Sequence, residues 1–246
     1  MEPLPQQGAI PIVAAVLNAA SQADGSVSPG EILTIFGQNI GPATPAYFTL
    51  GADGKAATNL GGVQVLFDGL PAPLIYASAT QINAIVPYEV AGKTVTSIAV
   101  SFSGANILAG GIPITDAAPA IFALNSTGEG EAAVLNQDNS INTPSNPAAR
   151  NSIVQIYATG QGLTSPPGIT GEITGLPLRK SILPVDVQIG GLDAQVIDAD
   201  SAPEEISGLF QVNAAIPSNT PVGSSVPVIL KIGNAQSQGT VSIAVK

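Results

Sequence analysis

The sequence predicts an all-β protein that is built as two tandem β-sandwiches. Glycine and proline occur 27 and 21 times in 246 residues, and they recur at the short, regular spacing that is typical of turns between short strands. Apolar residues make up 45% of the chain and charged residues only 10%, as expected for a globular protein with buried cores. A stretch of the first half also returns, with changes, in the second half.

The repeat begins with a predicted β-hairpin. Val63–Phe67 is predicted to be a strand, Asp68-Gly69 a two-residue turn, and Pro73–Tyr76 the returning strand. Asp-Gly is favoured in such turns because their central positions need a positive φ. The copy lies at Val185–Ile197, where Gly190-Gly191 replaces Asp68-Gly69. We therefore expect a second hairpin of the same kind there.

A third strand follows each hairpin and carries polar residues that the two halves share. Gln81–Val86 alternates its side chains between two faces, and Phe210–Pro217 is its copy. The shared polar positions are Gln81, Asn83, Gln211 and Asn213. A functional interpretation makes them ligand contacts. We favour a structural role, in which they hydrogen-bond to backbone at a strand end or domain edge, because both halves keep them in the same register.

The other elements of the first half complete a sandwich. Ile10–Leu17 is either a first strand or a short buried helix, since its periodicity fits both. Glu31–Phe36 is predicted to be a strand, Gly37–Gly61 a long polar loop, and Val95–Phe102 and Ile107–Ile114 the closing strands. About seven strands in about 115 residues are typical of an immunoglobulin-like sandwich.

The second half repeats this order and predicts a second immunoglobulin-like sandwich. Its further strands are expected at Ala132–Asn136, Ile153–Tyr157, Val226–Ile232 and Thr240–Val245. The matched strands also predict the core residues, which are Leu33, Ile35, Val63, Val65, Ile82, Ala84, Val154, Ile156, Val185, Val187, Val212 and Ala214. We expect two domains, 1–116 and 117–246, with a short, stiff connection at Asp116–Pro119 and negligible helix.

The charge of the chain argues against two classes of partner. The net charge is −10, and Arg179-Lys180 is the only basic pair in the sequence. Nucleic acid needs a positive footprint, so we expect no nucleic-acid binding. An anionic membrane surface is disfavoured for the same reason, and the apolar run Ile10–Ala20 is too short for membrane insertion. The acidity fits simple solubility.

The absence of cysteine and histidine from the sequence removes several chemistries. Disulfides and thiolate metal sites are excluded, as are a Ser-His-Asp triad and histidine metal ligands. A carboxylate pair for glycoside hydrolysis stays open, because two acids can meet from anywhere in a fold. The acids are few, lie mostly in predicted turns and are not duplicated in the repeat. We therefore expect no enzyme activity and no cofactor.

The densest group of oxygen ligands lies in the second half, at Asp198, Asp200, Glu204 and Glu205. Calcium prefers such hard ligands on a loop. The group lacks the Asp-x-Asp-x-Asp-Gly pattern of a calcium loop. A solvated acidic loop is the preferred interpretation, with these four residues as weak calcium candidates.

Aromatic residues bear on sugar binding. Tyr47, Phe48, Tyr76 and Tyr88 are the loop or polar-tipped aromatics of the first half, and a sugar-binding face would use such rings as stacking platforms. The chain has no tryptophan, and we expect Tyr76 in the core.

Four long stretches of the sequence resemble a known group. They are Ser28–Pro42, Gly61–Gly92, Leu135–Gly162 and Leu209–Pro217. These stretches resemble an uncharacterised C-terminal domain family of secreted soil-bacterial proteins, whose halves are similar to tandem IPT/TIG immunoglobulin-like domains. The resemblance implies an early-set immunoglobulin-like fold, export and attachment outside the cell, and it supplies no catalytic residue. Members of the group usually follow a long N-terminal region, which this sequence does not include.

The predicted function is a non-enzymatic extracellular or cell-surface module with a structural, adhesion or assembly role. The alternative is a carbohydrate-binding module of a secreted protein. Met1-Glu-Pro-Leu-Pro lacks a basic n-region, so an exported protein would carry its signal peptide ahead of Met1. The expected partner is a protein or polysaccharide at the cell surface. Such a fold can also self-associate through strand edges or through the N-terminal strand, because sandwiches leave edges unpaired.

Overall fold

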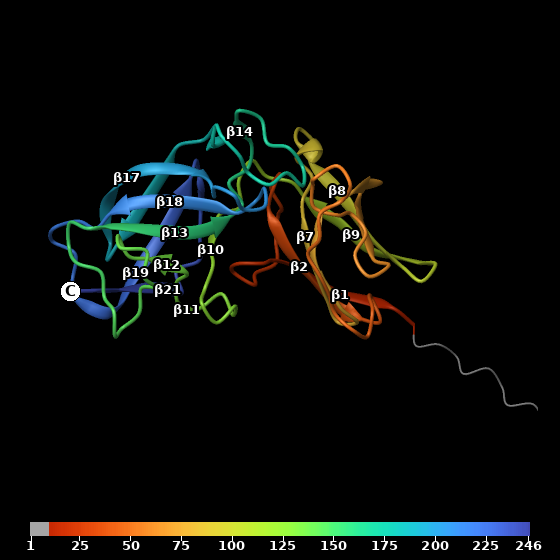
Figure 1. The fold of residues 1–246 in the computed structure, drawn as a ribbon, viewed down its shortest axis with the longest axis horizontal. Helices are drawn as coiled ribbons and strands as arrows, with labels where there is room; N and C mark the ends of the chain where they lie inside the picture. Colours follow the sequence, from red (N-terminus) through yellow and green to blue (C-terminus); the bar gives the residue numbers. More distant parts are fainter. Residues whose placement is uncertain (1–9) are drawn as a thin grey trace, which may run out of the picture.

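The computed structural model describes residues 10–246 and confirms the all-β class (Figure 1). The helix in this part of the chain is a single 3-10 turn, η1 at Tyr88–Val90. None of the described residues form a helix of the length and apolar character that crossing a membrane requires. The opening segment Met1-Glu-Pro-Leu-Pro lies outside the described residues.

The first lobe consists of strands β1 to β9, which form two antiparallel sheets. One sheet has the order β1 (Ile12–Asn18), β2 (Ile32–Gln38), β7 (Gln81–Ile85), β6 (Leu74–Ala77) and β3 (Ala46–Tyr47). The other has the order β5 (Leu70–Pro71), β4 (Gln64–Phe67), β8 (Val95–Phe102) and β9 (Ala105–Pro113). The two layers enclose one hydrophobic core.

The N-terminal run is a strand and not a helix. β1 pairs antiparallel with β2 of its own sheet, from Ile12 opposite Gln38 to Asn18 opposite Leu33, with a bulge between Val13 and Ala15. Pairing within its own sandwich is the arrangement expected for a terminal strand.

The predicted hairpin is present, but its returning chain changes sheets. The turn is confirmed by positive φ values of 50° at Asp68 and 85° at Gly69. Only the two-residue strand β5 returns along β4, and β6 then pairs with β7 in the opposite layer. The expected single return through Pro73–Tyr76 was therefore wrong, because Pro73 has no N–H with which to extend the ladder and the chain crosses between the sheets there.

The loop predicted at Gly37–Gly61 also contains a strand that the sequence did not reveal. β3 pairs with β6, and the ring of Tyr47 packs edge-on against Tyr76 with centroids 5.6 Å apart. The Tyr47 side chain remains 68% exposed. Two residues are too few for a periodic pattern, so packing against β6 decides this element.

The second lobe consists of strands β10 to β21, linked in one hydrogen-bonded network. Its main path runs through β10 (Ala120–Ile121), β13 (Ile153–Thr159), β18 (Phe210–Ala215), β17 (Leu192–Ser201), β16 (Val185–Ile189), β19 (Gly223–Ile232), β21 (Val241–Val245) and β11 (Gly130–Glu131). The short strands β12 (Val134–Leu135), β14 (Thr164–Ser165), β15 (Lys180–Ser181) and β20 (Ala235–Gln236) pair beside this path.

Strand β17 makes the second lobe two-layered. Its first residues, from Leu192 to Ala194, pair with β16, and its remainder, from Gln195, pairs with β18 through a ladder that has a bulge between Val196 and Asp198. The sheet therefore folds over itself, and Figure 1 shows β13 and β18 crossing in front of β19 and β21. Bulges provide such bends because one extra residue kinks the strand and increases its twist.

The residues predicted for the cores lie in two buried clusters, one in each lobe. Val185 alone among them is half-buried, packed against the rim of the second cluster. The largest fully buried side chains include Phe67 in the first lobe and Phe210 in the second. Alternation along the strands thus identified the inward faces.

Candidate functional site

The two lobes meet at a region that we call the joint, where β2 begins and β13 ends. The N–H of Ile32 donates a hydrogen bond to Thr159 Oγ1 at 2.9 Å, and that hydroxyl donates to the Gly208 carbonyl at 2.8 Å. Thr159 is fully buried. The Thr159 hydroxyl therefore accepts a hydrogen bond from the first lobe and donates one within the second lobe, so that it acts as both acceptor and donor.

Glycines allow the backbones at the joint to approach closely. A Cβ atom at Gly208 would lie 2.4 Å from the Gly30 carbonyl oxygen of the first lobe. A Cβ atom at Gly160, just after β13, would lie 1.9 Å from the Ala118 carbonyl oxygen in the connecting segment. No side chain fits at either place, so the joint depends on these glycines.

Tyr88 of η1 is the aromatic residue of the joint. Ideal Cβ atoms built at Gly30 and at Gly168 would both collide with its ring, at 2.6 and 2.3 Å. The ring is therefore packed between glycines of the two lobes. The N–H of Tyr88 donates to Thr170 Oγ1 at 2.9 Å, and burial raises the pKa of Tyr88 to about 12. Tyr88 is thus a packing residue and does not supply a surface for stacking.

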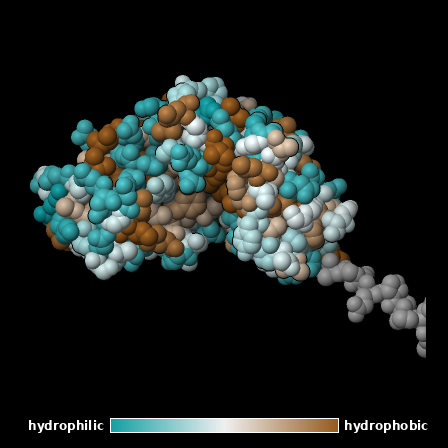
Figure 2. Space-filling view, viewed as in Figure 1, coloured by the Kyte–Doolittle hydropathy of each residue, from teal (hydrophilic) through white to brown (hydrophobic). Residues whose placement is uncertain are grey.

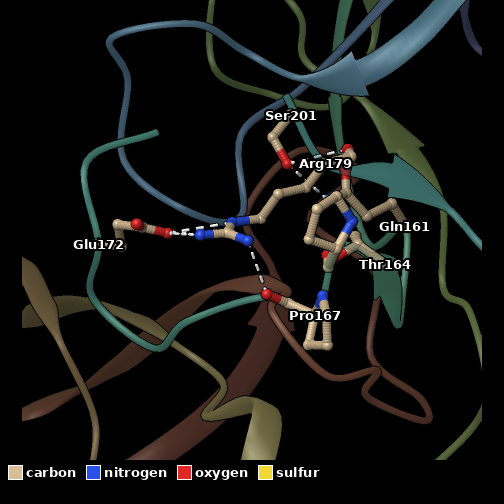
Figure 3. A network of polar contacts seen from close by, with 7 residues as sticks. Gln161, Thr164, Pro167, Glu172, Arg179 and Ser201 are labelled. Carbon is tan, nitrogen blue, oxygen red and sulfur yellow. Dashed lines mark hydrogen bonds and ion pairs between the residues drawn. The ribbon is translucent and has the colours of Figure 1, made fainter. Parts of the chain in front are cut away.

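A partly buried arginine, Arg179, holds the second-lobe loop that carries these contacts (Figure 3). Arg179 Nε donates to Glu172 Oε2 at 3.0 Å, Nη2 makes a short contact with the same oxygen, and Nη1 donates to the Pro167 carbonyl at 2.7 Å. Arg179 directly precedes β15, and Figure 3 shows its guanidinium between Glu172 and Pro167. Planar guanidinium groups suit such multiple contacts. The loop that presents Gly168 and Thr170 to Tyr88 is therefore fixed from within its own lobe.

Glu31 is a buried carboxyl beside the joint. Its Oε2 accepts from the Ser28 N–H at 2.7 Å, and its Oε1 accepts from Asn18 Nδ2 at 2.9 Å. Asn18 Nδ2 also donates to the Ala118 carbonyl at 3.2 Å. Burial raises the pKa of Glu31 to about 8, although the hydrogen bonds from Ser28 and Asn18 lower it. This group therefore changes charge near neutral pH.

A cleft of about 380 Å³ opens on the outer face of the β1–β2–β7 sheet. A polar row lines it, in which Gln81 Nε2 donates to Asn83 Oδ1 at 2.8 Å and Asn83 Nδ2 donates to Thr34 Oγ1 at 3.0 Å. Apolar side chains complete the walls, including Phe36 from β2 and Phe122 from the second lobe. Figure 2 shows hydrophobic residues gathered where the lobes meet.

The second lobe carries a matching row on β18. Gln211 Nε2 donates to Asn213 Oδ1 at 3.0 Å and to Gln155 Oε1 at 3.4 Å. The expectation that the shared Gln and Asn side chains bond to backbone was therefore wrong. They lie on the outer faces of central strands, where neighbouring side chains are closer than any free backbone group.

The acidic candidates are divided between two places. Asp198 and Asp200 on β17 lie opposite Asn213 and Gln211, and Lys180 Nζ is 3.7 and 3.8 Å from their carboxylates. Burial raises the pKa of Asp200. Glu204 and Glu205 lie in the turn after β17. Among residues 10–246 no three acidic side chains gather as metal ligands would, and the cation beside the aspartates is Lys180.

Comparison with known proteins identifies the first lobe. Residues 15–111 match the IPT/TIG domain, an immunoglobulin-like β-sandwich, as the sequence resemblance implied. No curated protein matches the chain. The solved structures to which the chain is similar include two that share little sequence identity with it. One is SGBP-B from a complex xyloglucan utilization locus in Bacteroides uniformis, at 12% identity and a TM-score of 0.27, over 94% of this chain and 49% of that one.

The other is the surface layer protein SbsC, domains 4–9, at 14% identity and a TM-score of 0.29, over 96% of this chain and 31% of that one. The chain therefore spans about half or less of the length of these two structures.

Proposed function

We propose that the chain is a non-enzymatic structural module of an extracellular or cell-surface protein, in which two sandwich domains, 1–116 and 117–246, act as one rigid unit. The observation that carries the proposal is the joint. Thr159, the close glycines and Tyr88 link the lobes through buried contacts, which support a rigid connection between them. A rigid pair of sandwiches suits a protein that spaces or presents other parts.

The connecting segment supports the proposed domain boundary. Ala117 belongs to the second core, and the Ala118 N–H donates to the Gly160 carbonyl at 2.9 Å. The Ala118 carbonyl accepts from Asn18 of the first lobe. The residues between the lobes therefore contact both lobes. They differ from a flexible Gly/Ser linker, which would leave the two domains free to move.

Small-angle X-ray scattering of the full chain tests this rigidity. The wild type should keep one radius of gyration and one scattering profile across salt concentrations, while Thr159→Ala should broaden the distance distribution. Thr220→Ala is the matched control, because Thr220 is equally buried and its hydroxyl has no hydrogen-bond partner. A wild type whose scattering requires many interlobe orientations would remove the basis of the proposal.

Exposure on the cell is tested separately. Brief trypsin treatment of intact source cells should release peptides of this chain, whereas a cytoplasmic protein should be released only after lysis. Release from lysed cells alone would exclude the surface assignment and leave the rigidity untouched.

A second function, carbohydrate binding, is favoured by the cleft beside the joint. Its amides are pre-oriented by their mutual hydrogen bonds, and Phe36 and Phe122 supply apolar surface. Sugar recognition combines such fixed polar groups with ring surfaces. Polysaccharide pull-downs and a glycan array test it, with Gln81→Ala expected to abolish binding. Gln211→Ala is the matched control, since it removes the same group from the second lobe's row, and equal loss in both variants would exclude the cleft.

A further inference from the structure

Two long strands of the first lobe have an unpaired edge. Among the described residues β1 pairs only with β2. The only described strand that pairs with β9 is β8, although the last carbonyl of β9, at Pro113, accepts a hydrogen bond from the Val27 N–H at an isolated bridge. The opposite edges of the same two sheets are β3 and β5, of two residues each. An edge strand presents unpaired N–H and C=O groups, which another strand can satisfy. The β9 edge lies on the side of the first lobe away from the second lobe (Figure 1).

The β9 edge lacks the charged residues that usually prevent pairing. Residues 94–115, which include β8 and β9, contain no Asp, Glu, Lys or Arg. Proteins commonly protect edges with lysine, proline or a bulge. β9 has Pro113 at its end and a bulge near Ala109. The stretch from Ala105 to Leu108 before the bulge has neither.

The surface around this edge is apolar. Leu108 on β9 is 76% exposed, and Val95 on the neighbouring strand is 51% exposed. A groove of about 390 Å³ runs between the β1 and β9 edges, and Asp24 is its only charged lining residue. Large exposed side chains beside an open edge are the combination that attracts another strand.

The charge of the chain indicates what covers the edge. Each copy carries a net charge of −10, so two copies repel each other overall. The neutral β8–β9 region can approach its own counterpart without that cost. An antiparallel edge is also self-complementary under a two-fold axis, which is the commonest symmetry of homodimers.

We propose that two copies of the chain pair through β9, antiparallel and centred on Ala105–Leu108, so that the β5–β4–β8–β9 sheet continues across the dimer. This assembly is independent of the rigidity and the carbohydrate binding proposed above. A single pair of edge strands buries little surface, so the dimer should be weak and should form only at high protein concentration.

Sedimentation velocity of the full chain from about 1 µM to about 1 mM tests the pairing over the range in which weak complexes dissociate. The wild type should shift from monomer towards dimer as concentration rises. Leu108→Lys should weaken dimerisation at least tenfold, because it adds a charge to each side of the two-fold contact. Leu176→Lys is the matched control, since Leu176 is 89% exposed in the second lobe, and it should dimerise as the wild type does.

Amide hydrogen exchange provides a second measurement that needs no variant. Exchange of the Ala105–Leu108 amides should slow at high concentration, while the β19 amides should not change. A wild type that stays monomeric throughout overturns the proposal. Dimerisation that Leu108→Lys leaves intact, or that protects strands other than β9, overturns it as well.

Discussion

Glu31 should make the stability of the protein depend on pH in an unusual direction. Its carboxyl has a pKa of about 8 in the folded chain, against an ordinary value of 4.5. Between these values the folded state binds a proton that the unfolded state has lost. The stabilising contribution is therefore fully present below pH 4.5 and is lost as the pH rises through 8.

The size of this effect follows from the same two values. A proton held only by the folded state changes the unfolding free energy by about 1.4 kcal/mol per pH unit. Over the interval from 4.5 to about 8 this amounts to roughly 5 kcal/mol. The chain has no histidine, so the side chain that ordinarily titrates in this window is absent.

Urea unfolding followed by circular dichroism at pH 5, 6, 7 and 8 measures this dependence, with the pH values chosen to span the titration of Glu31. The wild type should lose stability steadily with rising pH, and Glu31→Gln should remove most of the slope because the amide stays neutral. The exposed Glu129 provides the control, and Glu129→Gln should keep the wild-type slope. A wild type whose unfolding free energy is flat over this range would refute the reasoning.

Three further predictions concern stability. Gly160→Ala should lower the free energy of unfolding in urea by more than about 2 kcal/mol, because its Cβ would meet a backbone oxygen at 1.9 Å. Gly191→Ala, at a similar positive φ in open space, should lower it by only about 1 kcal/mol. Phe210→Ala should lower the free energy of unfolding by about 3–5 kcal/mol, because Phe210 is fully buried. The same change at the partly exposed Phe48 should lower it far less, and chemical denaturation measures both. Hydrogen bonds from Ser97 and Lys93 hold the pKa of Asp68 well below its usual range. Asp68→Asn should therefore lower the melting temperature at pH 7, and the difference from the wild type should shrink in acid, where Asp68 becomes protonated. An equal drop in melting temperature at both pH values would contradict this prediction.

Local sequence patterns predicted much of the fold because they report which face of a strand is buried. β8 has the bounds that alternation and its flanking turn predicted, Val95–Phe102. The Asp68-Gly69 turn has the positive φ values that its residue types favour. The N-terminal run fitted strand and helix equally, and only the ladder with β2 distinguishes them.

The candidate site was harder to predict because its contacts join distant residues. The shared Gln and Asn positions were found, but their partners were not, since Thr34 lies 49 residues from Asn83. Tyr88 gave no sign of packing between two lobes. Glu31 was one acid among 17. Its perturbed pKa arises from burial, which the sequence did not indicate because charged residues are usually exposed.

The sequence by itself determined the all-β class, the turns and the inward faces, because each depends on residues within a few positions of one another. Tertiary structure alone decided where the chain changes sheets, which edges stay unpaired and how the lobes join. The bond between Ile32 and Thr159 spans 127 residues. Such contacts exist only once both cores have formed, because packing and not local preference brings their atoms together.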